Sequence, residues 1–240
     1  MIGISIAANR EWRWVLERFK ITSSDCQKYP FGEYFKKNLF GEDLIIYKCG
    51  HKKMCCSAAT QYMIDHFQLS KIIVAGTCAG IDERYNTLDI IFPERLVQCD
   101  CNLPEFDTLI HEAFSVFIDM SRYGTVKTGT LGSEDKPVVF IEDLRKLKAE
   151  GITVADMEAA AIAYVCKANN VECVVIKGIS DFPKEVHGVE DRELVVEQHD
   201  VFVVNIPIIM KDIFDNYLEF ALANHFDYVE NNSYEEKLIF

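Results

Sequence analysis

Short apolar runs alternate along this chain with segments whose apolar residues recur at helical spacing. Nearly continuous apolar runs at 2–8, 71–76 and 171–179 are typical of strands covered on both faces. Two segments rich in good helix formers, 54–67 and 157–167, stand beside them. This alternation predicts the α/β class, as a single domain in which a central mixed sheet lies between helices in a three-layer α/β/α arrangement.

The remaining segments complete this predicted arrangement. Asn9 is expected to cap a first helix through its side chain. Further strands are predicted at 34–40, 44–49, 88–92, 95–99 and 124–131, and the first two of these form a hairpin. Further helices are predicted at 109–120, 138–150 and 193–223, and Pro207 is expected to kink or break the last one.

Three segments are expected to lack regular structure inside this frame. The small-residue segment 76–80 is predicted to be a loop with free backbone N–H groups, 132–137 a polar loop, and 182–192 a loop or lid. The last residues, 224–240, are acidic and aromatic without a clear period. We expect them to form a loosely attached tail, packed only by its end at 238–240.

Composition limits the possible functions. The chain has 240 residues, of which 49% are hydrophobic, enough for one large domain with a sizeable core. Its formal net charge of −13 argues against nucleic-acid binding, which needs Lys and Arg to neutralise phosphates. No apolar run is long enough to span a bilayer, and the start of the chain lacks the basic region and apolar core of a secretion signal. We therefore expect a cytoplasmic protein that binds neither nucleic acid nor a membrane.

The cysteines do not predict a zinc site. Cys55 and Cys56 are adjacent, and Cys99 and Cys101 are separated by one residue, so the paired CxxC spacing of a structural zinc site is missing. Their number, nine, is odd, and many lie in apolar runs. The simplest interpretation is small buried thiols in a reducing compartment.

Three acidic residues fall where predicted strands end. Glu11 follows the first strand, Glu158 stands where a strand becomes a helix, and Asp181 comes just after the strand 171–179. In an open α/β sheet, ligands bind beyond the carboxyl ends of the strands, so these carboxylates are expected to share one crevice. Each also has a structural interpretation: Glu11 and Glu158 as acids that favour a helix dipole, and Asp181 as the cap of the following turn.

Carboxylates in one crevice suit the cleavage of a bond between a sugar and a base. The ribosyl carbon becomes cationic in the transition state, as in glycoside hydrolysis. A purine leaves poorly as an anion, so one acid must protonate it while another carboxylate positions and activates water. A third carboxylate can hold the ribose hydroxyls and favour positive charge on the sugar. Carboxylates alone can fill these roles, so we expect no metal or organic cofactor.

Two motifs of the chain resemble those of a known superfamily. The sequence Asp-Met-Glu-Ala at 156–159, followed by Ile-Ser-Asp at 179–181, is similar to the nucleoside phosphorylase and hydrolase superfamily. Within it, the chain most resembles the 5′-methylthioadenosine/S-adenosylhomocysteine nucleosidases, over most of its length. The resemblance implies a nucleoside phosphorylase-like fold with residues 1–223 as the catalytic domain, a small nucleoside substrate and a homodimer.

The resemblance also implies roles for individual residues. Asp181 matches the general acid that protonates the base at N7, and Ser180 would orient its carboxylate. Glu11 matches the carboxylate that activates water, and Glu158 matches the residue that binds the ribose hydroxyls. The other substrate-binding positions that it implies are Met157, Thr77, His51 and Val138.

Two further charged residues lie close to these motifs. Asp156 matches an acidic position beside the site, and we expect it to support the site rather than to react. Lys177 lies inside an apolar strand. It is expected either to pair with an acid near the crevice or to reach the surface, and we assign it no catalytic role.

The sequence favours water over phosphate as the nucleophile. Related phosphorylases place an Arg just upstream of the small-residue loop, where this chain has Val74 and Ala75. Arg10 stands in the first loop, but the neighbouring Glu11 would repel phosphate. The predicted function is a purine nucleoside N-ribohydrolase that releases the base from methylthioadenosine, S-adenosylhomocysteine or a related nucleoside. A phosphate-dependent purine nucleoside phosphorylase and a non-catalytic nucleoside-binding or storage relative are the alternatives.

Two segments depart from the nucleosidase pattern. Nucleosidases have Ser-Gly-Asp, a small residue and a Phe that stacks on adenine, where this chain has Ser-Glu-Asp-Lys-Pro at 133–137. They have Gly-Ile-Gly-Lys beside the 5′ substituent, where this chain has Gly-His-Lys-Lys at 50–53. His51 either belongs to a surface loop or favours a polar 5′ group, such as a hydroxyl or that of a modified nucleoside, with methylthioadenosine as the equal alternative.

Overall fold

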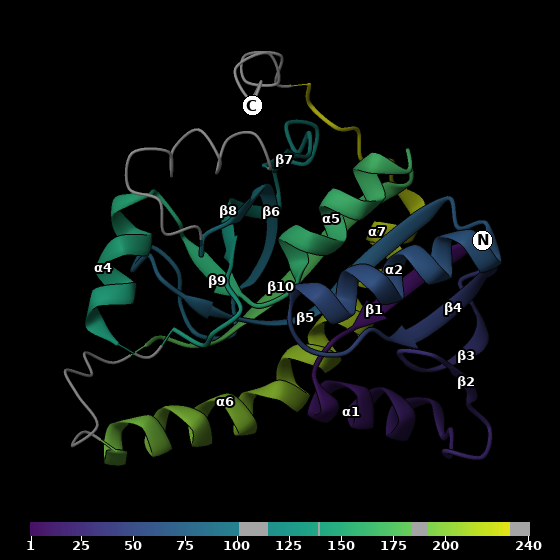
Figure 1. The fold of residues 1–240 in the computed structure, drawn as a ribbon, viewed down its shortest axis with the longest axis horizontal. Helices are drawn as coiled ribbons and strands as arrows, with labels where there is room; N and C mark the ends of the chain where they lie inside the picture. Colours follow the sequence, from purple (N-terminus) through teal and green to yellow (C-terminus); the bar gives the residue numbers. More distant parts are fainter. Residues whose placement is uncertain (101–114, 139, 184–191, 231–240) are drawn as a thin grey trace.

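The computed structural model describes residues 1–100, 115–138, 140–183 and 192–230, and a single mixed sheet forms its centre (Figure 1). Its strands are β1 (Ile2–Ile6), β2 (Gln27–Tyr29), β3 (Gly32–Leu39), β4 (Glu42–Lys48), β5 (Lys71–Gly80), β6 (Ile90–Gln98), β7 (Val116–Phe117), β8 (Lys127–Ser133), β9 (Val154–Asp156) and β10 (Glu172–Asp181). The helices are α1 (Asn9–Phe19), α2 (Lys53–Phe67), α4 (Ile141–Ala149), α5 (Ala159–Ala168), α6 (Arg192–Asp212), the π-helix η2 (Ile213–Tyr217) and α7 (Leu218–Ala223). The predicted α/β class with a central mixed sheet is confirmed.

The sheet is organised around β5. One edge of β5 pairs in parallel with β10 along almost its whole length. The other edge pairs first with β1, in parallel, and then at its end with β9, in the antiparallel sense. Beyond β1 the sheet continues through β4, β3 and β2, while β10, β6, β8 and β9 lead back to β5 and close a ring of strands. The gap along β5 between β1 and β9 is where the candidate site forms.

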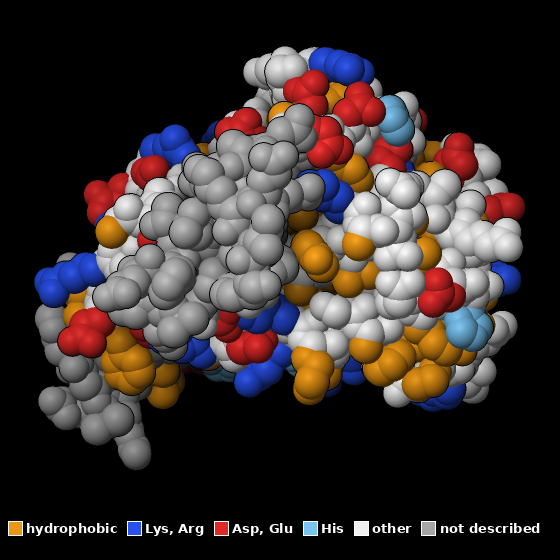
Figure 2. All heavy atoms as spheres, turned by 45° about the horizontal axis from the view of Figure 1, so that its top comes forward, with side chains coloured by type: hydrophobic (Ala, Val, Ile, Leu, Met, Phe, Trp, Pro, Cys, Tyr) orange, Lys and Arg blue, Asp and Glu red, His pale blue; other side chains and the backbone are white. Residues whose placement is uncertain are grey.

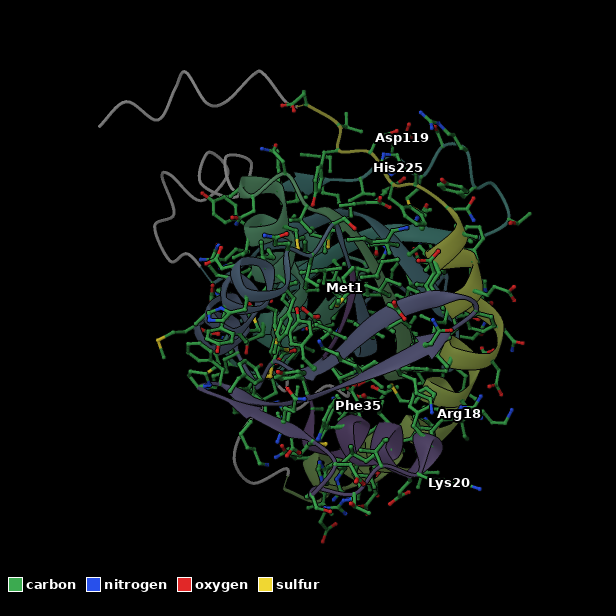
Figure 3. The ribbon with its side chains drawn as sticks, turned by 90° about the vertical axis from the view of Figure 1, so that its right-hand side faces the viewer. Met1, Arg18, Lys20, Phe35, Asp119 and His225 are labelled. Atoms are coloured by element: carbon green, nitrogen blue, oxygen red, sulfur yellow. The ribbon has the colours of Figure 1, made fainter. Side chains whose placement is uncertain are left out.

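Helices cover both faces of this sheet. In Figure 1, α2 and α5 lie side by side across the front of the sheet, and α1 and α6 run along the bottom of the view, below it. The close fit of α6 depends on Gly178 of β10, because a Cβ there would stand 2.2 Å from a side-chain carbon of Ile209. The apolar face of α1 packs between β3 and η2, with the Phe19 ring 6.0 Å from Phe35 and 5.8 Å from Phe214. Figure 3 shows Arg18 on the same helix, where it pairs with Asp215 of η2.

Several strand boundaries differ from the prediction because pairing, and not local composition, sets the length of a strand. The segment 76–80, predicted as a loop, is the second half of β5, since it pairs with β10 and β9. The two strands predicted around Pro93 are one strand, β6, with a register shift between Pro93 and Arg95. Gly132 and Ser133, also predicted as loop, belong to β8 and pair with β9.

The helix predictions need three corrections. The helix predicted at 109–120 is wrong at its end, where β7 pairs with β6; residues 109–114 lie outside the described part. Asn9 is not the cap of α1: Ala8 holds that position and Glu11 accepts a bond from its backbone N–H. The last helix continues through Pro207 and leaves the α pattern only at Ile213, where η2 begins.

The described part of the predicted tail packs on the body of the protein. Phe226 is 1% exposed, and the Tyr228 hydroxyl donates to the carbonyl of Val171 at 2.7 Å. Residues 224–230 are therefore attached rather than loose. The end of the tail at 238–240 and most of the predicted lid, 184–191, lie outside the described residues. The boundary between a catalytic domain at 1–223 and a tail at 224–240 stays a prediction.

Candidate functional site

The Glu11 carboxylate occupies the gap along the edge of β5. Its Oε1 accepts bonds from the backbone N–H of Thr77 at 2.7 Å and from the Thr77 hydroxyl at 2.8 Å. Its Oε2 accepts from the backbone N–H of Ala8 at 3.1 Å. The side chain is 2% exposed, and Gly76 makes room for it, since a Cβ there would lie 2.8 Å from Oε1. Glu11 thus satisfies both an orphan donor of α1 and a strand donor that no neighbouring strand reaches.

Asp181 reaches the same place from the end of β10. The register of β10 against β5 shifts between Ile179 and Asp181, so a β-bulge re-aims the chain there, as is common beside functional sites. The Ser180 hydroxyl lies 2.6 Å from Asp181 Oδ1 and 3.0 Å from the carbonyl of Cys78. Burial raises the pKa of the Asp181 carboxyl, while the hydrogen bonds from Ser180 and Gln198 oppose that rise.

Glu158 stands at the N-cap position of α5. Its Oε1 accepts a bond from the backbone N–H of Lys52 at 3.0 Å, and the Nδ1 atom of His51 lies 3.9 Å from the same oxygen. The residue is 6% exposed. Burial, and next the Asp156 carboxylate, raise the pKa of Glu158 to about 7, against a smaller lowering by Lys177.

Asp156 and Lys177 form an ion pair beneath these acids. Lys177 Nζ lies 2.9 Å from Asp156 Oδ2, and both side chains are almost fully buried. Although burial alone lowers the pKa of Lys177, the carboxylates of Asp156, Glu11 and Glu158 raise it above its usual value. Asp156 also accepts bonds from the Ser133 hydroxyl and from the backbone N–H of Ala159, the first residue of α5. The expected pairing of Lys177 with an acid is therefore found, and Asp156 fixes the start of α5.

All predicted site residues line one cavity of about 390 Å³. They are Glu11, His51, Thr77, Val138, Met157, Glu158, Ser180 and Asp181. His51 is exposed at the cavity and Val138 is buried. The structure brings these residues together, while their roles remain predictions.

Side chains of α6 also line this cavity, which was not predicted from the sequence. Val195, Gln198, His199 and Phe202 line it. The spacing of Val195, Gln198 and Phe202 places them on one face of a helix, and Asn205 continues that face. This helical spacing was the available signal, but nothing in the sequence indicates that the helix turns this face toward the ends of β5 and β10.

The loop after β8 borders the cavity. Pro137 and Val138 line it. Asp135 ties this loop to the start of α2 by accepting a bond from the backbone N–H of Lys53 at 3.0 Å. The Lys53 amine in turn pairs with Asp100, whose other oxygen accepts from the backbone N–H of Asp135. This network connects the loop at 133–138 with the segment that carries His51.

The cations near the cavity are already paired. Among the described residues that line it, the Lys and Arg side chains are those of Lys136 and Lys177. Lys136 pairs with Asp143 at 2.6 Å, and Lys177 with Asp156. Arg10 is exposed and does not line the cavity. On the face drawn in Figure 2, Lys and Arg side chains are dispersed among Asp and Glu.

Among the described residues, no group of three or more His, Cys, Asp or Glu side chains is arranged to hold a metal ion. None of the helices in the described ranges combines the length and apolar character that a membrane crossing needs.

The chain is similar to known proteins in both sequence and fold. The family model described as the phosphorylase superfamily matches residues 21–215. Over 199 residues the chain is 28% identical to the 5′-methylthioadenosine/S-adenosylhomocysteine nucleosidase of Tolumonas auensis, covering 74% of this chain and 85% of the relative. It is 27% identical over 211 residues to the aminodeoxyfutalosine nucleosidase of Helicobacter pylori, covering 80% and 90%. The fold is similar to that of futalosine hydrolase of Helicobacter pylori, with a TM-score of 0.73 at 22% identity, covering 89% and 97% of the two chains.

Proposed function

Because this chain belongs to the phosphorylase superfamily, we propose that it is a purine nucleoside N-ribohydrolase. Its substrate is methylthioadenosine, S-adenosylhomocysteine or a related nucleoside, and water attack on the ribosyl carbon releases the free base. The observation that carries the proposal is the convergence of Glu11, Glu158 and Asp181, three buried carboxylates from different elements, on one cavity.

Asp181 acts as the general acid. The departing purine accumulates negative charge, and a proton delivered to N7 removes it. A carboxyl can deliver a proton near neutral pH only if its pKa is raised, and burial raises the pKa of Asp181. Ser180 orients this carboxyl through the contact with Oδ1.

Glu11 positions and activates the attacking water. Its two oxygens are held by Thr77 and Ala8, so the carboxylate is fixed before the substrate enters. A fixed base needs no reorganisation when water attacks, which is the main advantage of such preorganised groups.

Glu158 binds the ribose hydroxyls and favours positive charge on the sugar. Among the described residues, only the backbone N–H of Lys52 donates to this carboxylate, at Oε1, so Oε2 is open to a ligand hydroxyl. Met157 and Thr77 line the same cavity, and in this proposal they contact the sugar. The negative charge of Glu158 is worth more in this buried site than in water, because the local dielectric is low.

Two observations support water as the nucleophile over phosphate. Val74 and Ala75, which stand where related phosphorylases place an Arg, are buried in β5. The two lysines that line the cavity among the described residues are paired with acids, so neither is a free ligand for phosphate.

Within this substrate class, His51 favours a polar 5′ substituent, with methylthioadenosine as the equal alternative. His51 lines the cavity within 3.9 Å of Glu158, on the side where the ribose is bound. An apolar thioether gains nothing from an imidazole, whereas a hydroxyl or a polar modified group can hydrogen-bond to it. Replacing His51 with Ile should shift selectivity from 5′-hydroxyl toward 5′-thioether substrates. Unchanged selectivity would contradict this part of the proposal.

The working form is a cytoplasmic homodimer in this proposal. Met54, at the start of α2 and three residues from His51, is 80% exposed, and Tyr164 of the neighbouring α5 is 46% exposed. A second subunit on these helices would cover apolar surface and approach the 5′ side of the cavity. All cysteines in the described part are free thiols, as is typical of a reducing compartment. Light scattering on a Met54→Glu variant, compared with the wild type, tests the dimer.

Base release tests the proposed function. The protein is incubated with adenosine, inosine, methylthioadenosine and S-adenosylhomocysteine, each with and without phosphate, and the free base is followed. Release without phosphate supports the proposal, and the preferred nucleoside identifies the base and the 5′ group. Release only with phosphate would make the protein a phosphorylase, and no release at all would favour a binding role.

A further inference from the structure

Helix α6 holds the bulge at the end of β10 with two amide side chains that are seven residues apart. Asn205 Nδ2 donates to the carbonyl of Ser180 at 2.7 Å. Gln198 Nε2 donates to Oδ2 of Asp181 at 2.9 Å. The first contact satisfies a backbone carbonyl at the register shift. The second reaches the side chain that has to gain and lose a proton.

The groups around Asp181 suit both of its protonation states. An ionised carboxylate only accepts hydrogen bonds, and here Ser180 and Gln198 supply one donor to each oxygen. The single hydroxyl hydrogen of Ser180 can instead bond the carbonyl of Cys78 at 3.0 Å, which leaves its oxygen free to accept. Gln198 has the same capacity, because turning its amide by half a rotation presents an acceptor in place of a donor.

The amide oxygen of Gln198 is unpaired in the described part of the structure. Gln198 Oε1 is buried and accepts no hydrogen bond from a described residue. Buried polar atoms without a partner are rare in native proteins and call for an explanation, of which a catalytic role is one. A turn of the amide brings this acceptor to Asp181 when the carboxyl is protonated.

We propose that Gln198 is a positioning residue for Asp181, donating to the ionised carboxylate and, with its amide turned, accepting from the protonated carboxyl. The inference rests on the proposed function, because it requires Asp181 to change protonation state in each turnover. Gln198 then keeps the acid in place both before it protonates the base and after the proton has left.

Other titratable groups surround the same cavity and must be held constant in any test. They are Glu11 of α1, His51, Cys78 of β5, Lys136, Asp156 of β9, Glu158, Lys177 of β10 and His199 of α6. None of them is changed by a substitution at Gln198, so a change in the titration of Asp181 reports on the amide.

The test is Gln198→Met, which keeps the length of the side chain and removes both amide atoms. The Asp181 carboxyl is titrated by carbon NMR in the full chain, its signal identified by loss in Asp181→Asn, and kcat is measured for base release. We expect the carboxyl to titrate about one pH unit higher, because the hydrogen bond lost to the charged form is stronger than the one lost to the neutral form. We expect kcat to fall about tenfold or more, because small misplacements of a reacting group are costly.

The matched control is Gln61→Met on α2, which removes hydrogen bonds to Asp65 and Asn169 from another half-buried Gln outside the cavity. It should leave the Asp181 titration and kcat unchanged. A second variant, Gln198→Glu, can donate only while it is protonated and repels Asp181 once it is ionised. The Asp181 carboxyl should therefore titrate higher still in this variant.

The outcomes separate the two proposals. An unchanged Asp181 titration in Gln198→Met would overturn the inference, whatever happens to kcat. If the wild type releases base and Gln198→Met does so at the same rate, the inference fails and the proposed function stands. If the wild type releases no base from any nucleoside, both fail, since no acid is then at work.

Discussion

Asp156 and Glu158 are two residues apart in the chain and both side chains are buried, but their carboxylates are used in opposite ways. Asp156 meets Lys177, the Ser133 hydroxyl and the start of α5, so both of its oxygens have partners. The Glu158 carboxylate accepts one hydrogen bond from a described residue, on Oε1. For these two neighbours, the difference indicates their roles. Asp156 has no oxygen left for a ligand and supports the fold, whereas Glu158 keeps Oε2 without a partner among the described residues and can bind a substrate hydroxyl.

The largest expected effect comes from removing the charge of Asp156. Asp156→Asn leaves the Lys177 ammonium buried without its counter-ion, and breaking a buried pair in this way costs about 3–5 kcal/mol. The free energy of unfolding, measured by urea denaturation, should fall by that amount. A loss below about 1 kcal/mol would mean that Asp156 is not the support described here.

The matched change at Glu158 should act on activity instead. Glu158→Gln keeps the shape and the contact with Lys52, but it removes the negative charge near the ribose. We expect kcat/KM for base release to fall about 10²–10³-fold, as for other preorganised charges in active sites, with no loss of stability at pH 7. If Glu158→Gln unfolds as easily as Asp156→Asn, the contrast between the two acids is wrong.

The pH dependence of stability should also distinguish Glu158 from Asp156. The folded protein raises the pKa of Glu158 from an ordinary value of 4.5 to about 7. Between these values the folded state binds more protons than the unfolded one, so the free energy of unfolding falls as pH rises from 4.5 through 7 and then levels off. This fall is at most about 3 kcal/mol. Comparing urea unfolding at pH 5 and pH 8 should show it in the wild type, and the part due to Glu158 should be missing in Glu158→Gln.

The smallest expected effect is at Ser133, which helps Asp156 to fix the start of α5. Its hydroxyl donates to Asp156 and accepts from the backbone N–H of Ala160 at 3.0 Å. Ser133→Ala should lower stability by about 1 kcal/mol, the usual cost of losing a helix cap, and leave kcat/KM within a few-fold of the wild type. Thermal unfolding together with base release checks both parts, and a large loss of activity would place Ser133 in contact with the substrate.

Much of the fold could be predicted from periodicity, because buried strands and amphipathic helices leave direct marks in the sequence. The class, the hairpin of β3 and β4, and the helices α2 and α5 follow from such marks. The end of β5 could not be predicted in this way, because its residues Gly76 to Gly80 are small and their strand conformation comes from pairing with β10 and β9. The ring closed by β9 depends on the same long-range pairing and leaves no local signal.

In the site, too, some residues could be predicted from the sequence and others could not. Glu11, Glu158 and Asp181 could be predicted because strand ends and family motifs mark them. The partners that hold these acids could not be predicted as such, because they come from segments far away in the chain: Thr77 for Glu11, the backbone of Lys52 for Glu158, and Gln198 for Asp181. The superfamily expectation is confirmed by the match over residues 21–215.

The central claim is that water, and not phosphate, attacks the ribosyl carbon. The most direct measurement is base release in ¹⁸O-labelled water, with and without phosphate, followed by mass spectrometry of the sugar. We predict one labelled oxygen in the free sugar, at the same rate whether phosphate is present or not. An unlabelled sugar phosphate formed only in the presence of phosphate would contradict it.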